Sequence, residues 1–444
     1  GCRSPVDPVA DSRLNSLRIS GSGIKFLVMG VRAGYLPRVV DSELDDALGW
    51  PAAVLIEGAK GVGKTATASQ RSRSQVLLDV DQGARAAAAI DPSLVLAGDK
   101  PRLIDEWQVA PSIWNHVRRA VDAHEGPFIL TGSATPADDA VRHTGAGRFS
   151  RLRMRPMTLF ELGRSSGAVS LGRLLDGEPT ATDAGELSIP DLADVTCTGG
   201  WPGLVGHSVT SAQRVLTSYL DSVSRTDIRR VDGVAREPAK VWSVLRALAR
   251  NVGTEASIAT IARDAGGSDG PADDDTARAY LAALERLMVV EDQPAWAPRL
   301  RSRSRLRSAP KRHFCDPSLA PAALQATPAQ LLRDLNYFGF LFESLVVRDL
   351  RVYAQHLGAT VSHYRDNIGE VDAIVDAGVR WGALEVKLGT TYVEEAARSL
   401  KKFVGRVDTA HRGEPAFLGV VVPTRYGYKR DDGICVIPVQ GLGP

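Results

Sequence analysis

Eight consecutive residues in the first part of the chain have the types and spacing that bind phosphate groups. They are Gly58-Ala59-Lys60-Gly61-Val62-Gly63-Lys64-Thr65, and they fit the pattern G-x-x-x-x-G-K-[ST] at every position. The glycines allow a tight turn whose backbone N–H groups point inward, at the positive end of the following helix. In this pattern the lysine reaches the β- and γ-phosphates and the threonine hydroxyl binds Mg²⁺. The sequence therefore predicts that residues 58–65 hold ATP with Mg²⁺, with a chance glycine-rich turn as the alternative.

Two acidic residues after a second apolar run would complete this site. Asp105 and Glu106 follow Arg102-Leu103-Ile104, a run typical of a strand. In proteins that hydrolyse a nucleotide bound at such a loop, a carboxylate at the end of a neighbouring strand positions the Mg²⁺. An adjacent glutamate can activate the attacking water. We assign the first role to Asp105 and the second to Glu106. Their presence favours nucleotide binding over a chance turn.

A hydroxyl and an arginine further along the chain are candidates for contact with the γ-phosphate. Thr131 or Ser133, at the end of the apolar run 127–133, would sense that phosphate, and a hydroxyl that only closes a turn is the equal alternative. Arg148 is the best candidate for an arginine that stabilises transition-state charge, in its own chain or from a neighbouring subunit. It is one of four arginines between residues 148 and 155, which all compete for that role.

A second group of residues with chemical potential lies near the C-terminus. Glu385 and Lys387 alternate with apolar residues, so a period of two places both on one face of a strand. Asp372 lies in the preceding apolar run, and Glu343 lies in a helical run before it. Two acids on adjacent strands can hold Mg²⁺ at a phosphodiester while a lysine steadies the attacking water. Asp372, Glu385 and Lys387 are the predicted catalytic residues. Glu343, with the two other acids, is a predicted metal ligand, and an ion pair on an exposed sheet face is the alternative.

Strands and helices must alternate to position the phosphate loop. The apolar run 52–56 predicts a buried strand before the loop, and residues 65–73 predict the helix after it. Further strands are expected at 75–80, 102–106 and 127–133, with helices at 41–48, 84–90 and 113–121. This alternation predicts a parallel sheet with helices on both faces, whose ligand site lies at the carboxyl ends of the strands.

The C-terminal part has its own alternation of helices and strands. A helix is expected at 338–357, then strands at 360–364, 370–375 and 382–388, a helix at 393–404 and a strand at 416–422. Residues 162–192 have little periodicity and are interpreted as a loose helical insert or linker. A helix at 212–224 is expected to form a small helical lid after the nucleotide domain.

Length and composition are those of a globular protein of several domains. The chain has 444 residues, which suggests two or three domains, and Lys+Arg 54 nearly balances Asp+Glu 52. This balance neither requires nor excludes a nucleic-acid partner. The four cysteines stand far apart, which argues against a zinc site and favours a reducing cytoplasm. Residues 1–34 are expected to be a poorly ordered leader without a secretory signal. No apolar run in the sequence is long enough to span a membrane, so no membrane partner is expected.

The order of these motifs resembles a large prokaryotic family of AAA-type P-loop ATPases whose members carry a C-terminal domain of unknown function. The resemblance spans residue 35 to about residue 440. Its motifs are Tyr35–Val40, the phosphate loop, Leu103–Gln108 with Pro111 and Trp114, Leu130–Ser133, Gly147-Arg148 and Pro156–Glu161. It implies an AAA-type nucleotide domain followed by a helical lid. In the C-terminal part, the order of elements and the spacing Asp372…Glu385-x-Lys387 resemble the restriction-endonuclease-like nucleases.

Residues 238–319 resemble a winged helix-turn-helix. Helices with apolar stripes are expected at 241–251, 257–264 and 275–289, followed by a wing at 290–315. The wing holds basic residues with no acid between them: Arg299, Arg301, Arg303, Arg305, Arg307, Lys311 and Arg312. Closely spaced cations of this kind bind a polyanion such as DNA. A solvated basic loop, or a module that contacts proteins, is the equal alternative.

The predicted fold is α/β with several domains. They are a leader (1–34), an AAA-type P-loop domain with a parallel sheet (35–160), a helical lid and linker (161–235), a winged helix (236–330) and a restriction-endonuclease-like α/β domain (331–444). The predicted function is hydrolysis of ATP, with ATP and Mg²⁺ as cofactors, coupled to binding or cleavage of DNA or RNA. The alternative is a signalling or interaction ATPase whose C-terminal modules bind a protein partner without nuclease activity. A homo-oligomer and a monomer both remain open.

Overall fold

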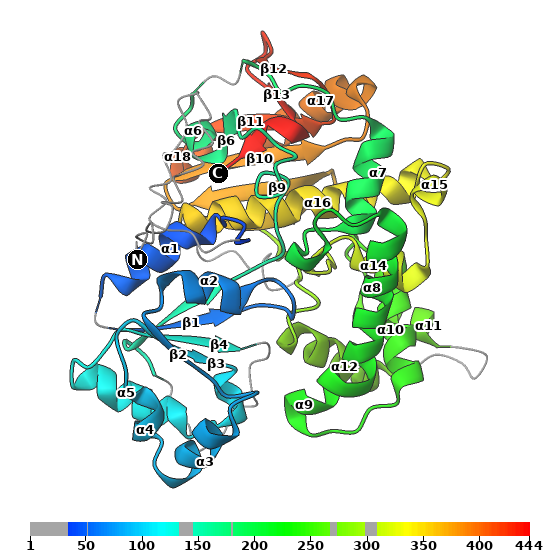
Figure 1. Ribbon diagram of the computed structural model, residues 1–444. Helices are drawn as coiled ribbons and strands as arrows, with labels where there is room; N and C mark the ends of the chain where they lie inside the picture. Colours follow the sequence, from blue (N-terminus) through cyan, green and yellow to red (C-terminus); the bar gives the residue numbers. More distant parts are fainter. Residues whose placement is uncertain (1–33, 51, 133–144, 179–180, 267–272, 298–308) are drawn as a thin grey trace, which may run out of the picture. The chain divides into compact units, whose positions relative to one another are not determined.

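The computed structural model describes residues 34–50, 52–132, 145–178, 181–266, 273–297 and 309–444 (Figure 1). Its first sheet consists of β1 (Ala53–Glu57), β2 (Ser74–Leu77), β3 (Arg102–Asp105), β4 (Phe128–Gly132) and β5 (Phe149–Arg153). These strands lie in the order β2-β3-β4-β1-β5, and each neighbouring pair is parallel. The predicted parallel sheet is confirmed. Strand β5 was not expected, because its arginine-rich sequence lacks the apolar pattern of a central strand.

Helices cover both faces of this sheet, as parallel strands require. They are α1 (Val40–Leu48), α2 (Lys64–Arg71), α3 (Gln82–Ile90), α4 (Ser93–Leu96) and α5 (Ile113–Asp122). Ile56 of β1 packs in one cluster with Leu44 of α1 and Ala68 of α2. Leu55, the preceding residue, packs in a second cluster with Trp114 of α5. Figure 1 accordingly shows α2 on one side of the sheet and α3, α4 and α5 on the other.

The segment after the first sheet differs from the expected loose insert. Strand β6 (Val169–Ser170) pairs with β14 (Leu442–Gly443), and β7 (Thr182–Asp183) pairs with β12 (Tyr426–Lys429). Helix α6 (Leu171–Leu175) lies between these strands in the sequence. Strands of two residues carry no periodic signal, so only long-range pairing reveals that β7 belongs to the C-terminal sheet and that β6 forms a two-stranded sheet with β14.

A helical segment connects the two sheets. It contains α7 (Ile189–Thr198), α8 (Val209–Ser222), the π-helical turn η3 (Val223–Asp227), α9 (Ile228–Asp232), α10 (Pro238–Arg250), α11 (Ile258–Ala265), α12 (Asp274–Arg286), α14 (Leu319–Leu324) and α15 (Pro328–Leu331). Helices α10, α11 and α12 agree with the three helices expected before the wing. Helix α14 packs on both α8 and α10, so the expected lid and the expected winged helix share one core.

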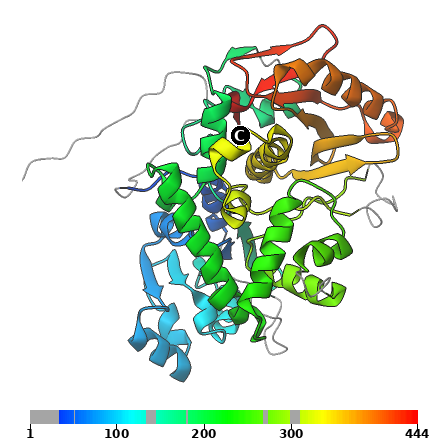
Figure 2. The same ribbon diagram turned by 90° about the vertical axis from the view of Figure 1, so that its right-hand side faces the viewer.

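The second sheet has seven strands in the order β7-β12-β13-β11-β10-β9-β8. Its further strands are β8 (Thr360–Arg365), β9 (Glu370–Ala377), β10 (Arg380–Val386), β11 (Phe417–Val422) and β13 (Cys435–Pro438). The long helix α16 (Leu335–His356) packs against β8, β9 and β10. Figure 2 shows it in yellow beside the orange strands. The second helix, α17 (Val393–Val404), packs against β9, β10 and β11.

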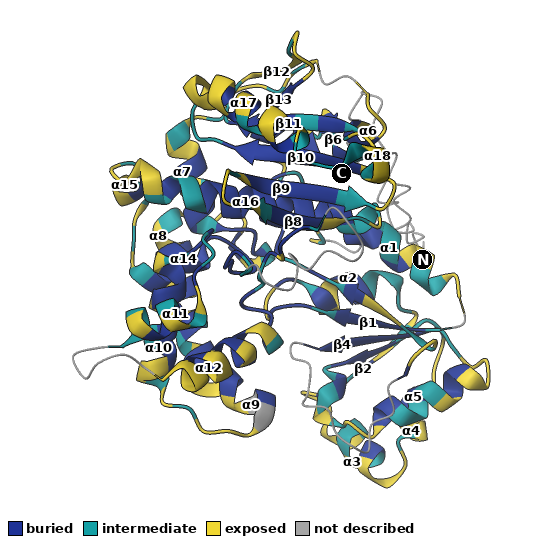
Figure 3. Ribbon diagram, turned by 180° about the vertical axis from the view of Figure 1, so that it is seen from behind, coloured by how far each residue is buried: buried dark blue, intermediate teal, exposed yellow. Residues whose placement is uncertain are grey.

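The interior of the second sheet is apolar on both faces. Leu384 and Val375 belong to the cluster that includes residues of α16, whereas Ala383 and Ile374 belong to the cluster around α17. Figure 3 shows β9, β10 and β11 largely in the dark blue of buried residues. The predicted strand and helix order of this part is confirmed from α16 to β11. None of the helices in the described ranges combines the length and apolar character that a membrane span needs.

Candidate functional site

The phosphate loop occupies the turn between β1 and α2, at the carboxyl end of the first sheet. Gly61 and Gly63 have φ of 81° and 98°, values that a side chain rarely tolerates. Gly58 is required for a different reason, because a Cβ at this position would lie 2.2 Å from the carbonyl oxygen of Met154. The backbone conformation therefore explains Gly61 and Gly63, and the close approach of Met154 explains Gly58.

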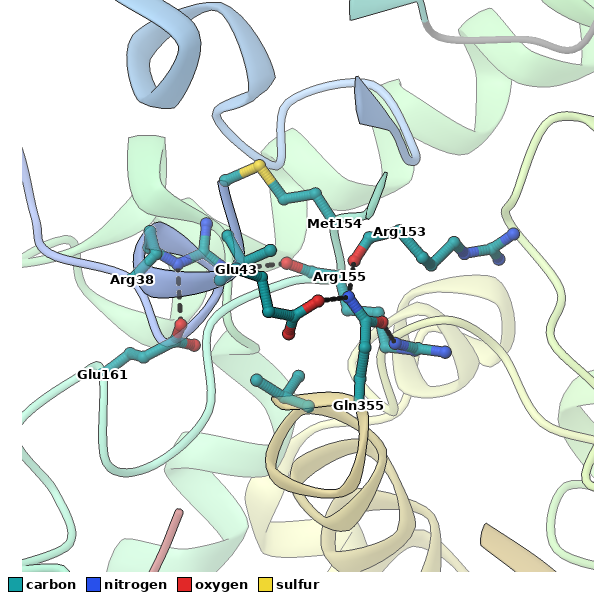
Figure 4. A pocket seen from close by; sticks show the side chains of 9 residues that line it. Arg38, Glu43, Arg153, Met154, Arg155, Glu161 and Gln355 are labelled. Carbon is teal, nitrogen blue, oxygen red and sulfur yellow. Dashed lines mark hydrogen bonds and ion pairs between the residues drawn. The ribbon is translucent and has the colours of Figure 1, made fainter. Parts of the chain in front are cut away.

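A buried ion pair holds the loop from outside. The Arg38 guanidinium donates to the carbonyl of Val62 over 2.8 Å, to the carbonyl of Arg155 over 2.7 Å and to the carboxylate of Glu161 over 3.0 Å. Glu161 also accepts from the backbone N–H groups of Val39 and Thr158. Figure 4 shows Arg38 and Glu161 facing each other beside Arg155. Arg38 and Glu161 lie in motifs quoted above, but nothing local in the sequence indicated that they pair.

Lys64 and Thr65, the last two residues of the loop, begin helix α2. The ammonium of Lys64 donates to the carbonyls of Gly58 and Ala59, each over 2.9 Å. Burial lowers the pKa of Lys64 to about 8, although Glu106 and Asp105 favour its charged form. The Thr65 hydroxyl donates to Asp105 Oδ1 over 2.8 Å. The Lys64 ammonium thus lies within the phosphate loop. A bound phosphate would replace the two carbonyls as its hydrogen-bond partner.

Asp105 lies at the end of β3 and collects two hydroxyl groups. Besides Thr65, the hydroxyl of Thr131 in β4 donates to the same oxygen, Oδ1. Asp105 and Thr131 are both buried. Carboxylate and hydroxyl oxygens are the ligands that Mg²⁺ prefers, so this donor set fits the ion. Ser133, the other hydroxyl considered at this strand end, lies outside the described residues.

Glu106 follows Asp105 in an unusual conformation. Its φ is 50°, in the left-handed region. The side-chain amide of Gln108 donates to the Glu106 carboxylate. The other end of the same amide, Gln108 Oε1, is buried without a hydrogen-bond partner among the described residues. Sequence reasoning assigned Gln108 no role, and only its position two residues after Glu106 could have suggested one.

A pocket of about 240 Å³ adjoins the loop and the first turns of α2. The residues that line it are Gly34, Tyr35, Leu36, Arg38, Gly63, Ala66, Thr67, Gln70 and Pro202. The Tyr35 hydroxyl donates to Asp41 Oδ1 over 2.6 Å and lies 2.8 Å from the Thr67 hydroxyl, which fixes its ring. The pocket therefore lies beside the expected phosphate site, with an aromatic side chain in its wall.

Two residues of the helical segment contact the loop. Lys60 Nζ forms an ion pair with Asp227 of η3 at 2.8 Å. A side chain at Gly61 would meet the ring of Trp201 at 3.7 Å, so this ring lies against the loop. Trp201 is in turn held by Ser318, whose hydroxyl accepts from its indole N–H over 3.1 Å. The loop is thus in contact with the segment that the sequence predicts as a lid.

Arg148 lies at the opposite end of the sheet from the loop. Its carbonyl accepts from the N–H of Ala53 at the start of β1, and its guanidinium pairs with Asp122 at 2.8 Å. Strand β1 has five residues, so about 16 Å of strand separates Arg148 from the phosphate loop. The structure therefore does not bring Arg148 to the nucleotide site of its own chain.

The C-terminal residues Asp372, Glu385 and Lys387 are brought together as predicted from their strand positions. Lys387 Nζ lies 2.6 Å from Glu385 Oε2 and 3.1 Å from Asp372 Oδ2. Asp372 Oδ2 also accepts from the backbone N–H of Val386, and Glu385 Oε1 accepts from the hydroxyl of Ser399 in α17. Glu385 and Lys387 do form the ion pair of the alternative interpretation, but the face is not an exposed one for the acids: Asp372 and Glu385 are each only 3% exposed, whereas the Lys387 side chain is 31% exposed.

Glu343 of α16 joins this cluster through a lysine that sequence reasoning had placed in the wing. Lys311 Nζ lies 2.6 Å from Glu343 Oε1 and 3.5 Å from Asp372 Oδ1. Burial raises the pKa of Glu343, and the Asp372 carboxylate raises it further; the same two causes raise the pKa of Glu385. Burial alone would raise the pKa of Asp372 as well, but Lys387 and Lys311 outweigh it and lower that pKa.

The predicted basic wing is only partly described. Lys311 and Arg312 are buried, at 3% and 7% exposure, and Arg312 pairs with Asp292. These two residues are therefore not available to a DNA backbone, which corrects that part of the expectation. The arginines at 299, 301, 303, 305 and 307 lie outside the described residues.

Three segments of the chain match known sequence families. Residues 51–163 match an AAA domain, residues 189–330 match a domain of unknown function (DUF8612) and residues 338–442 match another domain of unknown function (DUF4143). Residues 51–163 are thus an AAA domain that carries a phosphate loop. The descriptions of the two later families state neither a fold nor an activity. No curated protein matches the chain.

Solved structures show weak likeness over larger parts of the chain. A Walker-type ATPase of Pyrococcus abyssi matches at 14% identity and a TM-score of 0.41, over 67% of this chain and 99% of that one. The replication initiator DnaA bound to AMPPCP and single-stranded DNA matches at 14% identity and a TM-score of 0.27, over 56% and 86%. A RuvB variant of Thermotoga maritima matches at 17% identity and a TM-score of 0.25, over 57% and 89%. TM-scores this low carry no argument about what this chain does.

Proposed function

We propose that the AAA-type domain of this chain binds ATP with Mg²⁺ and hydrolyses it. The observation that carries this proposal is the convergence of Lys64, Thr65 and Asp105 at the mouth of a glycine loop. Each of the three has the chemistry that its position requires: a cation for phosphate, and a hydroxyl and a carboxylate for the metal. The family match of residues 51–163 supports the same conclusion.

Different residues of the chain are proposed to bind different parts of ATP. Residues 58–63 direct N–H groups at the phosphates, and the Lys64 ammonium replaces its two carbonyl partners with phosphate oxygens. Thr65 and Asp105 would hold the Mg²⁺, which, when bound, offsets the negative charge of the phosphates. Thr131 fixes the orientation of Asp105 and is our candidate sensor of the γ-phosphate. The pocket beside Tyr35 would receive the base and ribose.

Glu106 is proposed as the general base that accepts a proton from the attacking water. Its backbone conformation directs it away from the regular strand, and Gln108 holds its carboxylate. An orienting hydrogen bond matters here because a general base contributes only when it lies within hydrogen-bond reach of the proton that it removes. Arg148 is proposed to stabilise transition-state charge only at the nucleotide site of a second copy of the chain. The nucleotide site of the same chain lies at the other end of β1 from Arg148.

We propose that the nucleotide state acts on the helical segment through the loop. Lys60 reaches Asp227, and the Trp201 ring lies against Gly61, so a nucleotide that reshapes the loop changes both contacts. The protein would then be an ATP-driven switch with its output in the residues after 189. A cytoplasmic location fits this proposal, because the described cysteines, Cys197, Cys315 and Cys435, are buried and unpaired.

We propose that this switch acts on a partner that is either a protein or a nucleic acid. The two wing cations that belong to the described residues are buried, which leaves the nucleic-acid interpretation without an exposed basic strip in those residues. The test is a binding titration with DNA and RNA at several salt concentrations. Binding whose log affinity falls linearly with log salt, together with faster ATP turnover, would establish the nucleic-acid alternative.

The central test is ATP turnover by the purified full chain. We expect turnover with Mg²⁺, none after chelation of the metal with EDTA, and recovery when Mg²⁺ is restored. Glu125→Gln, an exposed acid outside the proposed site, is the matched control for substitutions of Glu106. ATP binding without turnover under any of these conditions would reduce the proposal to nucleotide binding alone.

A further inference from the structure

Two lysines and three carboxylates form an alternating row in the C-terminal part of the chain. The order is Glu343, Lys311, Asp372, Lys387 and Glu385, and each lysine lies between two acids. The two oxygens of Asp372 face different lysines, Oδ1 toward Lys311 and Oδ2 toward Lys387. Each side of the central carboxylate is therefore already occupied by an ammonium group.

This arrangement does not fit the divalent ion that the nuclease resemblance implies. Mg²⁺ demands oxygen ligands at about 2.0–2.1 Å in near-octahedral geometry. Lys311 Nζ instead stands between Glu343 and Asp372, and Lys387 Nζ between Asp372 and Glu385. Among the described residues, no group of three or more His, Cys, Asp or Glu side chains is placed to hold a metal ion. The lysine of the expected pattern is Lys387, so Lys311 is the additional cation.

The backbone around Lys311 keeps its side chain in this place. Lys311 and Gln293 exchange two backbone hydrogen bonds, of 2.9 and 3.0 Å, and the Gln293 side chain donates to the carbonyl of Asp372. The next residue, Arg312, donates from its N–H to the carbonyl of Thr254 in the helical segment. These hydrogen bonds fix the backbone of Lys311 beside the cluster.

The charges of the cluster also explain why a second lysine lies among the three acids. When all three acids are ionised, they and Lys387 alone would carry a net negative charge in a buried place, which a divalent ion would normally neutralise. Lys311 supplies part of that positive charge from the protein itself, and it is only 3% exposed. Lys311 is hydrogen-bonded to Glu343 and ion-paired with Asp372, and removing such a cation would leave buried carboxylates without their counter-charge.

We propose that Lys311 takes the place of the divalent ion, so that the C-terminal cluster binds neither Mg²⁺ nor Mn²⁺ and cleaves no phosphodiester. The cluster instead joins three parts of the chain: the 293–311 backbone pair, helix α16 and the second sheet. The nuclease-like arrangement of Asp372, Glu385 and Lys387 is then a structural element of a binding module. This inference does not depend on ATP hydrolysis at the phosphate loop.

The experiment is a Mn²⁺ titration of the nucleotide-free full chain, followed by electron paramagnetic resonance and calorimetry. We compare the parent with Glu385→Gln, which removes a required ligand while keeping its shape. The expected result is the same Mn²⁺ stoichiometry in both proteins. One bound Mn²⁺ per chain that disappears in Glu385→Gln would overturn the proposal, as would cleavage of DNA or RNA that disappears in the same variant.

A second variant tests the role of Lys311 directly. Lys311→Met removes the ammonium, and we expect it to gain one Mn²⁺ per chain that is lost again in the double variant with Glu385→Gln. Lys402→Met, an exposed lysine of α17, is the matched control and should gain none. A folded Lys311→Met that gains no Mn²⁺ would show that Lys311 does not stand in for the ion. If Lys311→Met does not fold, the comparison of the parent with Glu385→Gln still decides the proposal.

Discussion

Lys64 and Thr65 are neighbours in the chain, but their surroundings give them different chemistry. The Lys64 side chain is buried with its ammonium on two loop carbonyls, whereas Thr65 is exposed and directs its hydroxyl to Asp105. Burial lowers the pKa of Lys64, so a phosphate that replaces the two uncharged carbonyls would favour the charged form of the ammonium. The affinity for ATP should therefore depend strongly on this single ammonium.

Lys64→Ala should lose most of its affinity for ATP. Hydrogen bonds to a charged group contribute about 1.5–3 kcal/mol, which corresponds to a loss of about 10- to 150-fold. The measurement is titration with a fluorescent ATP analogue, with Lys240→Ala, an exposed lysine, as the control. Undiminished affinity in a folded Lys64→Ala protein would remove the basis for the phosphate-loop assignment.

Glu106→Gln should bind ATP normally and hydrolyse it slowly. The amide keeps the shape of the side chain but cannot accept a proton from water, and a general base contributes about 10²- to 10⁴-fold to the rate. Turnover and ATP affinity are measured side by side. Asp105→Asn should differ by requiring more Mg²⁺ for half-maximal turnover. If Glu106→Gln turns over ATP like the parent, the base lies elsewhere.

Gln108→Ala should lower kcat while leaving the KM for ATP unchanged. Gln108 contacts Glu106 and does not line the nucleotide pocket, so it acts by positioning the base. A misplaced catalytic group can cost about 100-fold in rate, which sets the upper limit of the expected loss. Gln82→Ala, at an exposed position in α3, is the control. Equal changes in KM and kcat would instead indicate a general distortion of the site.

At the scale of elements, the edge strand β5 determines the shape of the phosphate loop. The N–H of Met154 donates to the carbonyl of Glu57 over 2.7 Å, and the Met154 carbonyl lies where a Cβ of residue 58 would be. The guanidinium of Arg38 joins the same region by donating to the carbonyls of Val62 and Arg155. The loop is therefore shaped by a neighbouring strand and by a residue before α1 as well as by its own glycines.

Gly58→Ala should distort the loop and weaken ATP binding. The new methyl group would lie 2.2 Å from a backbone oxygen, and such overpacking costs about 1–3 kcal/mol. Thermal unfolding and ATP titration measure the two effects. Gly203→Ala is the control, since a Cβ there meets no atom within 4 Å. A Gly58→Ala protein with parental stability and affinity would mean that β5 yields easily and does not shape the loop.

At the scale of the whole molecule, one buried arginine connects the parts of the described chain. Arg348 of α16 pairs with Asp316 at 2.8 Å and with Asp349 at 2.6 Å. Asp316 accepts from the N–H of Gly200, and Asp349 accepts from the N–H of Leu159. Gly200 precedes the tryptophan that lies against the phosphate loop, so this network links the segment that follows the first sheet, the helical segment and the C-terminal part.

Arg348→Met should destabilise the whole protein. The substitution leaves two buried carboxylates without their cation, which costs about 3–5 kcal/mol. Thermal unfolding is the measurement, and Arg398→Met on the exposed face of α17 is the control, with an expected change within about 0.5 kcal/mol. Parental stability in Arg348→Met would mean that Asp316 and Asp349 find other partners and that the three parts are held together in another way.

Local patterns in the sequence were sufficient for most elements and for the residues that adjacent elements bring together. The phosphate loop follows from its glycine motif, the strand ending in Asp105 and the strands carrying Asp372 and Glu385 follow from their apolar residues, and the structure confirms these elements. The roles of their side chains are still predictions. Periodicity is informative here because a helix or strand that buries one face repeats its apolar residues at a fixed spacing. This spacing can be recognised within a single segment of the sequence.

Only the tertiary structure decided which residues far apart in the sequence form buried ion pairs and which short strands pair with each other. Lys311 reaches Glu343 and Asp372, Arg38 reaches Glu161, and the short strands β6 and β7 join partners at the far end of the chain. The basic run of the wing predicted that Lys311 contacts DNA or lies in a solvated loop, and Arg148 was the candidate for a nucleotide that lies at the opposite end of its sheet. A buried charge must find a counter-charge wherever packing places one, and that choice depends on contacts between segments that no local pattern records.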